Sequence, residues 1–121
     1  DNTFERVDAR RREVLGDSHV DRSDAGTTEF TEEFMAFITR YAWGDVWTRP
    51  GLEKKTRSLL NLAMLAALNR ESEFKLHVKG ALNNGATSED IKEVLFQVSI
   101  YAGVPAALSA FQWAQDVMDE L

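Results

Sequence analysis

His77 is the side chain of this sequence whose type and setting best suit chemistry. It is one of only two histidines, and it lies within residues 56–85, where a strongly apolar stretch is followed by an amphipathic one. Glu73 precedes it by four residues, so on a helix the carboxylate can orient the ring and favour its protonated form. Such an imidazole is a candidate general acid or base. The alternative, more common for one histidine on an amphipathic helix, is a solvated surface pair.

Cationic side chains surround this stretch and are candidate partners for a carboxylate ligand. They are Arg49, Arg57, Lys75 and Lys79. Arginine is the better bidentate partner because its planar guanidinium matches the carboxylate geometry. The alternative is a solvated rim of charges.

Aromatic residues with a polar edge precede the apolar stretch. Tyr41, Trp43 and Trp47 can wall a small-molecule pocket, because such rings exclude water and still donate hydrogen bonds. The alternative is a core or a subunit interface. A metal site made of His77, Glu73 and His19 is weakly supported, since two histidines at unknown separation form no recognisable ligand spacing.

Several classes of site are disfavoured by what the sequence lacks. The absence of cysteine excludes disulfides, thiolate nucleophiles and zinc sites of the cysteine type, and suits a reducing cytoplasm. Ser58 and Ser99 have no histidine at a fixed offset and no nucleophile-elbow glycines. Phosphate-binding glycine loops are also absent. The net charge of −6 disfavours nucleic acid as a partner.

The chain of 121 residues is expected to form one domain, residues 1–121, with a single core. Its longest apolar run, residues 59–68, is interrupted by Asn61 and is far shorter than the roughly 20 residues that span a bilayer. We therefore expect neither a signal peptide nor a transmembrane helix, and a cytoplasmic protein.

The hydrophobic periodicity predicts an all-α fold of about six helices. The first, residues 4–15, is highly charged and ends at Gly16, and residues 16–26 are predicted to be a loop rich in Asp, Ser and Gly. A second helix follows, with Thr27 or Thr28 as cap, and its aromatic face up to Tyr41 is expected to be buried. Residues 43–51 break regular structure.

The second half of the chain is predicted to contain four helices. Residues 52–68 form the apolar, central one, and the corner at Asn69 leads to residues 71–84, which end at Gly85 with a left-handed cap. Residues 87–90 begin the next helix with a capping box, and Pro105 begins the last helix, residues 106–121.

Four segments carry a resemblance to a known family. They are residues 41–52 (YAWGDVWTRPGL), 55–64 (KTRSLLNLAM), 76–85 (LHVKGALNNG) and 101–107 (YAGVPAA). Together they resemble the carboxymuconolactone decarboxylase family, over almost the whole chain. The segment around His77 alone marks the broad superfamily shared with alkyl hydroperoxidase D, whereas residues 43–52 and the loop at residues 16–23 are typical of the decarboxylase branch.

The differences between this sequence and the superfamily pattern reduce the number of reactions that the site could catalyse. Peroxidatic members carry a Cys-x-x-Cys pair before the histidine, where this chain has Arg70 and Glu73, so thiol peroxidase chemistry is excluded. The acidic proton relay of those enzymes falls at about Ser58, and it is not carried over. Many decarboxylases read Pro-His where this chain has Glu71-Ser72, so no second histidine beside His77 is implied.

The resemblance implies a carboxy-lyase that converts 4-carboxymuconolactone to β-ketoadipate enol-lactone without a cofactor or metal, in protocatechuate catabolism by the β-ketoadipate pathway. His77 is then the proton donor and oxyanion stabiliser. The anionic lactone substrate would be held by Arg49 and Arg57 first and Lys79 next. Trp43, Trp47 and Tyr101 would keep the pocket dry.

The resemblance also implies an alkyl hydroperoxidase D-like helical bundle that assembles as a homo-oligomer, a hexamer, with the His19 loop reaching a neighbouring subunit. The apolar content of so small a chain favours self-association as well. Two alternatives stay open: an enzyme of the same fold acting on another lactone or acid, and a non-catalytic helical oligomer in which His77 is structural.

Overall fold

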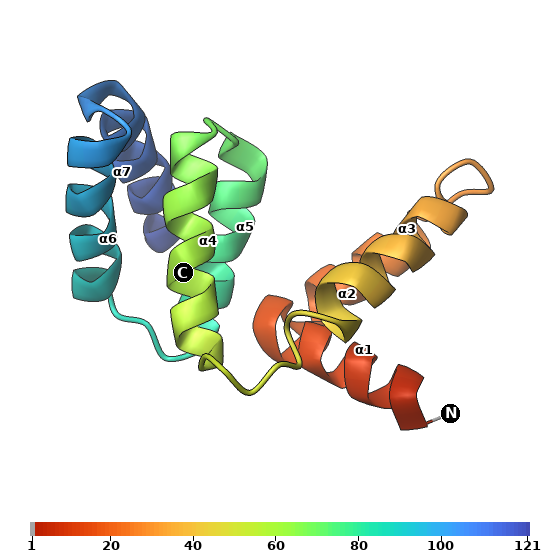
Figure 1. Cartoon of the computed structure of the whole chain (residues 1–121). Helices are drawn as coiled ribbons and strands as arrows, with labels where there is room; N and C mark the ends of the chain where they lie inside the picture. The colour runs from red at the N-terminus through yellow and green to blue at the C-terminus, as the bar shows by residue number, and fades with distance from the viewer. Residues whose placement is uncertain (1) are drawn as a thin grey trace. The chain divides into compact units, whose positions relative to one another are not determined.

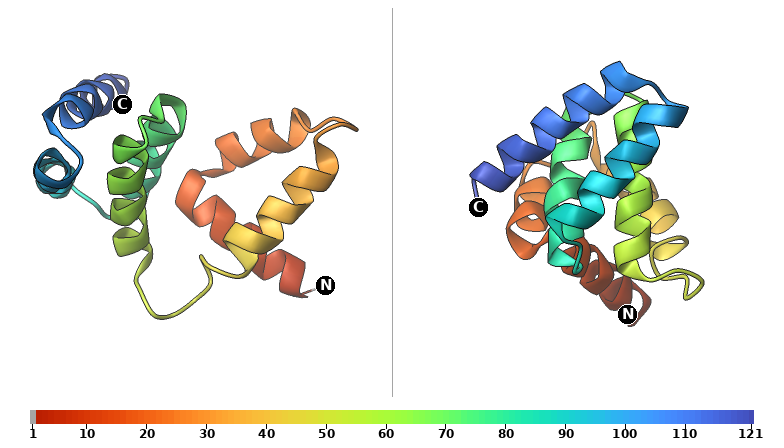
Figure 2. Two further views of the ribbon diagram at one scale, coloured as in Figure 1. Left: turned by 45° about the horizontal axis from the view of Figure 1, so that its top comes forward. Right: turned by 90° about the vertical axis from the view of Figure 1, so that its left-hand side faces the viewer.

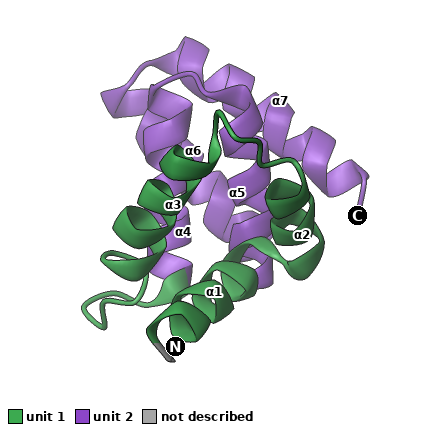
Figure 3. Cartoon of the chain, turned by 90° about the vertical axis from the view of Figure 1, so that its right-hand side faces the viewer, with its two compact units in different colours: residues 1–54 green, residues 55–121 purple. Residues whose placement is uncertain are grey.

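The computed structural model describes residues 2–121, and within this range the chain forms seven α-helices, a short π-helix and no strand (Figure 1). The predicted all-α class is confirmed. The helices group into two compact units that meet in sequence at residues 54 and 55 (Figure 3). The elements are α1 (Asn2–Leu15), α2 (Asp17–Ala25), α3 (Glu32–Ile38), η1 (Thr39–Gly44), α4 (Lys54–Ala67), α5 (Glu71–Asn83), α6 (Ser88–Tyr101) and α7 (Val104–Asp119).

Ion pairs explain why residues 17–25 form helix α2, so the predicted loop at residues 16–26 is wrong. Arg12 of α1 binds Asp17 at 3.1 Å and Asp21 at 2.9 Å, both on α2. Arg11, buried on α1, binds Asp24 at 3.0 Å. The aspartates that looked like loop residues are therefore countercharges to α1, and Val20 of the same helix is fully buried.

The arginine at the centre of this network is strongly held in its charged form. Arg12 also bonds to Asp8 at 2.8 Å, one turn earlier on α1. Its three hydrogen-bonded aspartates, Asp8 first, raise the pKa of the Arg12 guanidinium above its ordinary value. The charge of Arg12 is thus balanced by aspartates of α1 and α2.

The aromatic helix after α2 begins later than predicted and then changes pitch. Thr28 and Thr31 bond to one another in a turn, and α3 begins only at Glu32. The helix continues as the π-helix η1, which ends at Gly44. An extra residue per turn rotates the following side chains, and Trp43 becomes buried.

The predicted burial of the aromatic face of this helix is wrong. The exposed fractions are 94% for Phe30, 61% for Phe34, 49% for Phe37 and 62% for Tyr41. Rings of three of them form a row, with centroids 6.4 Å apart for Phe34 and Phe37 and 5.5 Å for Phe37 and Tyr41. We call these four side chains the aromatic row.

The second unit is an up-and-down arrangement of α4, α5, α6 and α7, in which α4 and α5 run antiparallel side by side (Figures 1 and 2). Helix α7 packs on both α5 and α6. Its core includes Leu62, Phe74, Val78, Ala81, Ile91, Leu95, Ala110 and Ala114. The apolar composition of α4 predicted a central, enclosed helix, but its Leu60 and Met64 are about half exposed.

Helix ends in this unit follow the sequence signals closely. Asn69 and Gly85 adopt the left-handed backbone, at φ 60° and 95°, where α4 and α5 end. Pro105 lies in the first turn of α7, where its missing N–H costs nothing. Among residues 2–121, no helix is both long and apolar enough to cross a membrane.

The predicted capping box at the start of α6 is confirmed and carries an additional ion pair. Asp90 N–H donates to Thr87 Oγ1 at 3.1 Å, and Thr87 N–H donates to Asp90 Oδ2 at 2.9 Å. Lys55, in the first turn of α4, binds the same carboxylate at 3.1 Å. The backbone hydrogen bond from Thr87, followed by Lys55, lowers the pKa of Asp90.

We predict that Thr87→Ala lowers the free energy of unfolding by about 1 kcal/mol, because it removes the side-chain acceptor of this cap. Asp90→Asn should weaken the cap and also remove part of the acid sensitivity. Since the folded-state pKa of Asp90 is depressed, its contribution is present above its unfolded pKa near 3.8 and is lost as the pH falls through the folded value.

Urea unfolding followed by circular dichroism, at several pH values from 7 down to 3, measures both effects. Lys92→Ala is the matched control, since Lys92 forms only an exposed pair with Glu89 in the same turn. A Thr87→Ala protein as stable as wild type would contradict the assigned role of the cap.

Candidate functional site

His77 lies on α5 and contacts α4 through Asn61. The distance from Asn61 Nδ2 to His77 Nδ1 is 3.4 Å, and both side chains are half-buried. This is a long hydrogen bond between two helices that run side by side. It is the contact that ties the candidate catalytic group to its support.

The register of α5 explains where the imidazole lies. Phe74, Val78 and Ala81 form the fully buried stripe of this helix. His77 precedes Ala81 by four residues and follows Phe74 by three, so it lies at the edge of that stripe. An edge position buries part of the ring and leaves part accessible, which suits a group that must meet a ligand.

A second polar contact joins the same two helices. Asn84, the C-cap of α5, donates from Nδ2 to Ser58 Oγ of α4 at 3.1 Å, and Ser58 is fully buried. Ser58 is the position at which the sequence analysis put the acidic relay of peroxidatic superfamily members. Here Ser58 serves helix packing, and Asn61, three residues later, contacts His77.

Two of the cations proposed for the substrate carboxylate, Arg57 and Lys79, lie on different helices and on different faces relative to the Asn61–His77 contact. Arg57 precedes Asn61 by four residues, so both occupy one face of α4, and its Nε atom is buried. Lys79 is exposed and follows His77 by only two residues, which places it on a different face of α5. Of these two cations, Arg57 is therefore the one that shares a helix face with Asn61, the hydrogen-bond partner of His77.

Lys75, another candidate cation, forms ion pairs with two carboxylates of this chain. It binds Glu71 at 3.1 Å and Asp116 at 3.7 Å. The hydrogen bond that Lys75 donates to Glu71 is the main cause that raises the pKa of Lys75. These contacts tie α5 to α7, so Lys75 has a structural role.

The two tryptophans predicted to wall a pocket belong to the core of the first unit. Trp43 and Trp47 are each only 6% exposed, and their rings stack with centroids 5.1 Å apart. Arg10 of α1 donates to the carbonyl of Trp47 at 2.8 Å. This arrangement matches the core alternative that the sequence left open.

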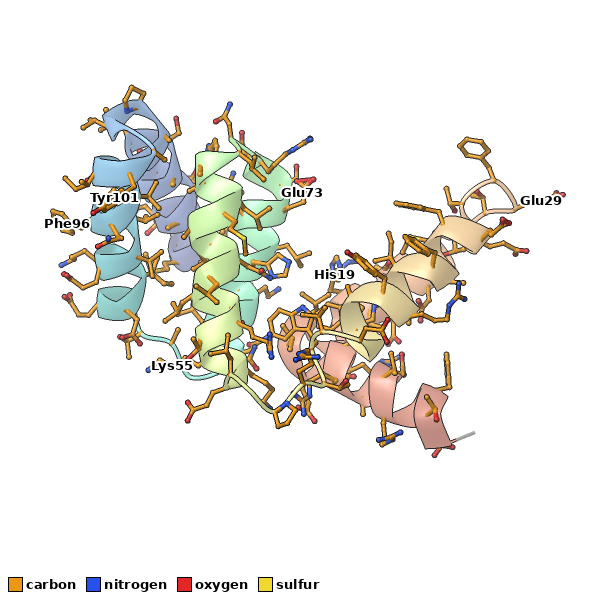
Figure 4. All side chains as sticks on the ribbon, viewed as in Figure 1. His19, Glu29, Lys55, Glu73, Phe96 and Tyr101 are labelled. Carbon is orange, nitrogen blue, oxygen red and sulfur yellow. The ribbon has the colours of Figure 1, made fainter. Side chains whose placement is uncertain are left out.

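Four other predicted site residues are each described within their own unit. Arg49 is exposed in the turns after η1, and His19 is half-buried on α2 (Figure 4). Tyr101, at the end of α6, is 82% exposed (Figure 4). Glu73 is exposed in the first turn of α5.

A groove of about 630 Å³ lies in the first unit, among α1, α3 and η1. Its lining includes the apolar Phe4 and Val7 and the charged Arg6 and Arg40. Two of its hydroxyls, those of Thr39 and Thr48, already donate to carbonyls of their own turns. Among residues 2–121, no cluster of three or more His, Asp or Glu side chains has the arrangement of a metal site.

Asn61 is the site residue that the sequence analysis did not assign. Its signal was present, because it is a polar residue that interrupts the apolar run of α4. Its partner is sixteen residues away on another helix. Spacing rules within one helix cannot identify such a pair, so the helix pairing was needed to find it.

Comparison with known proteins agrees with this architecture. The carboxymuconolactone decarboxylase family profile matches residues 32–116, which includes parts of both units. The chain is 46% identical to 4-carboxymuconolactone decarboxylase of Acinetobacter baylyi, over 92% of this chain and 83% of that protein. It is 37% identical to nitrosuccinic acid decarboxylase of Metarhizium robertsii, over 92% of this chain and 78% of that one.

A third relative, 4-carboxymuconolactone decarboxylase of Pseudomonas putida, is 54% identical over 29% of this chain and 73% of that sequence. The family profile covers well over half of the chain, and two relatives align along nearly all of it. The protein belongs to the carboxymuconolactone decarboxylase family.

Proposed function

We propose that this protein decarboxylates 4-carboxymuconolactone to β-ketoadipate enol-lactone without a cofactor, in protocatechuate catabolism. The observation that carries the proposal is the half-buried His77, held by Asn61 in a chain that is 46% identical to a decarboxylase of this substrate. A single oriented imidazole, with a cation for the remote carboxylate, suffices if the substrate itself accepts the electrons.

The structure of the substrate makes it its own electron sink. The departing carboxylate is on a ring carbon that is vinylogous to the lactone carbonyl. When carbon dioxide leaves, the electron pair of the broken bond moves through the ring double bond to the carbonyl oxygen and forms a dienolate. A proton added to the carbon next to the carbonyl then gives the enol-lactone. The site must stabilise the oxyanion and deliver that proton.

His77 is the group we assign to these two tasks. A hydrogen-bond donor directed at a developing oxyanion contributes about 3 to 4 kcal/mol. General acid help contributes about 10² to 10⁴ in rate. The position of His77 at the edge of a buried stripe gives it both a fixed orientation and a partly dry environment, which strengthens such a hydrogen bond.

Arg57 is our first choice for the remote carboxylate of the substrate, which stays on the product. It shares a face of α4 with Asn61 and offers a guanidinium that binds carboxylates in bidentate fashion. Roles for Arg49, His19, Trp43, Trp47 and Tyr101 at the substrate stay predictions. Of these, the tryptophans act first as core residues of their own unit.

A second substrate class deserves a test because of the relative named as a nitrosuccinic acid decarboxylase. In nitrosuccinic acid a carboxylate is bound to the carbon that carries the nitro group, and the nitro group can accept the electron pair. It also has a second, remote carboxylate. The two substrates thus require the same features of a site: an oxyanion donor, a proton source and a cation.

We predict that His77→Ala and His77→Gln reduce kcat by about 10² to 10⁴, because both remove the proton donor. Carbon dioxide release from 4-carboxymuconolactone generated in situ measures this, with circular dichroism to establish that the variants are folded. Near wild-type turnover by either folded variant would show that His77 is not the acid.

The same assay separates the alternatives for the whole protein. Full activity in the presence of a chelator is expected for a mechanism without a metal. Release of carbon dioxide from nitrosuccinate but not from the lactone would move the protein to the second substrate class. Release from neither would overturn the proposed activity.

We also predict that Arg57→Ala raises KM about 10- to 100-fold, since a charged hydrogen bond to a carboxylate contributes roughly 1.5 to 3 kcal/mol. Arg57→Lys should recover only part of the affinity, because an ammonium cannot bind in bidentate fashion. Lys79→Ala is the matched control on another face of α5, and it should leave KM within about twofold of wild type. Equal effects at Arg57 and Lys79 would contradict the assignment.

We infer further that the aromatic row is covered by a second copy of this chain. Aromatic side chains have about 150–250 Å² to bury, so the four partly exposed rings offer on the order of 500 Å² per subunit, a large part of the ~800 Å² that each partner contributes to a standard interface. A second copy is always available and supplies further exposed apolar residues of its own, including Phe96, Ile100, Leu108 and Phe111. A homo-oligomer follows, for which a hexamer is our expectation.

We predict that a Phe34→Glu/Phe37→Glu double variant has a lower mass than the wild-type assembly in multi-angle light scattering, because charge in the row prevents its burial. The control is Glu29→Gln/Glu33→Gln, which alters charge near the row without removing an aromatic ring. A monomeric wild-type protein would refute this inference, as would an unchanged mass for the double variant.

A further inference from the structure

We propose that Asn61 is a positioning residue that holds His77 in the neutral form with its hydrogen on Nε2. This inference concerns the site described above, and its catalytic part rests on the proposed function. The observation that carries it is the contact between Asn61 Nδ2 and His77 Nδ1 at 3.4 Å.

The chemistry of the two groups determines the tautomer. The amide nitrogen of asparagine is only a donor, so the ring nitrogen that faces it must present a lone pair. In a neutral imidazole, one nitrogen accepts and the other carries the hydrogen. With Nδ1 as acceptor, Nε2 carries the hydrogen and is the atom that can donate to a developing oxyanion.

The setting of Asn61 explains why an amide is kept at this position. It follows Leu59 and Leu60 and precedes Leu62 on α4, and Leu62 is fully buried. A half-buried amide in such a helix costs free energy unless it is hydrogen bonded, and an apolar residue would pack as well. The position therefore has a reason beyond packing, and the neighbouring imidazole supplies it.

The orientation of the pair is fixed by a second contact between the same helices. Asn84 bonds to the buried Ser58 at 3.1 Å, about one turn along α4 from Asn61. Two contacts at different heights restrict the sliding and rotation of α4 against α5. The amide of Asn61 thus meets Nδ1 in a defined register, as a supported site requires.

A variant that replaces the hydrogen-bond donor at position 61 by an acceptor tests the role of the amide. In Asn61→Asp a carboxylate replaces the donor, and it can only accept, so it should draw a hydrogen to Nδ1. Asn61→Leu removes the contact at similar volume and should leave a mixture of the two tautomers. We expect kcat to fall at least tenfold in both variants. KM should stay within about threefold in Asn61→Leu, because the substrate cation is unchanged, whereas in Asn61→Asp the new carboxylate lies one turn from Arg57 and should raise KM.

The tautomer of His77 is the measurement that distinguishes the two roles, because a merely structural role of Asn61 would leave the tautomer unchanged. Long-range proton–nitrogen NMR correlations distinguish a ring protonated at Nε2 from one protonated at Nδ1. The chain has two histidines, so the spectrum of His77→Gln assigns the signal. We expect the Nε2-protonated pattern in wild type, the Nδ1-protonated or doubly protonated pattern in Asn61→Asp, and a mixture in Asn61→Leu.

Ser58→Ala is the matched control, since it removes the other contact between α4 and α5 and leaves the amide in place. It should lower the stability of the fold but retain the Nε2-protonated pattern. A wild-type ring protonated at Nδ1, or the same pattern in wild type and Asn61→Leu, overturns the inference. If no variant or wild type decarboxylates any substrate, the proposed function fails, whereas the NMR pattern still decides the positioning role.

Discussion

The pairing of α4 with α5 is the constraint on which the candidate site depends. Apolar packing through Leu62, Phe74 and Val78 brings the two helices together without specifying one register, because such contacts are non-directional. The two polar contacts, Asn61 with His77 and Ser58 with Asn84, add direction. They are placed where an error in register would leave a buried hydroxyl or an amide without its partner, which is costly.

The first unit depends on a different balance of forces. Its core is small, and α1 and α2 are joined mainly by arginines of one helix and aspartates of the next. Most of these pairs are partly exposed, where a single pair contributes little, but Arg12 is shared by three carboxylates and Arg11 is buried. The stacked rings of Trp43 and Trp47 pack in the core of this unit.

Several predictions failed for one reason, namely that a periodic pattern identifies an apolar face but not what covers it. The aromatic row and the open side of α4 were predicted to be buried, and both are exposed in the single chain. Conversely, residues 16–26 were predicted to be a loop from their composition. Their aspartates form a helix because the partners that stabilise them lie on the preceding helix.

The sequence by itself determined the helical class, most helix ends of the second half, and the identity of the candidate acid. These features depend on local rules: the capping box at Thr87, the left-handed residues Asn69 and Gly85, and a histidine at the edge of an apolar stripe. The tertiary structure decided that Asn61 of α4 lies within hydrogen-bonding distance of His77, and that Trp43 and Trp47 belong to a core. Those outcomes depend on contacts between residues distant in sequence, and only the packing of helices brings such residues together.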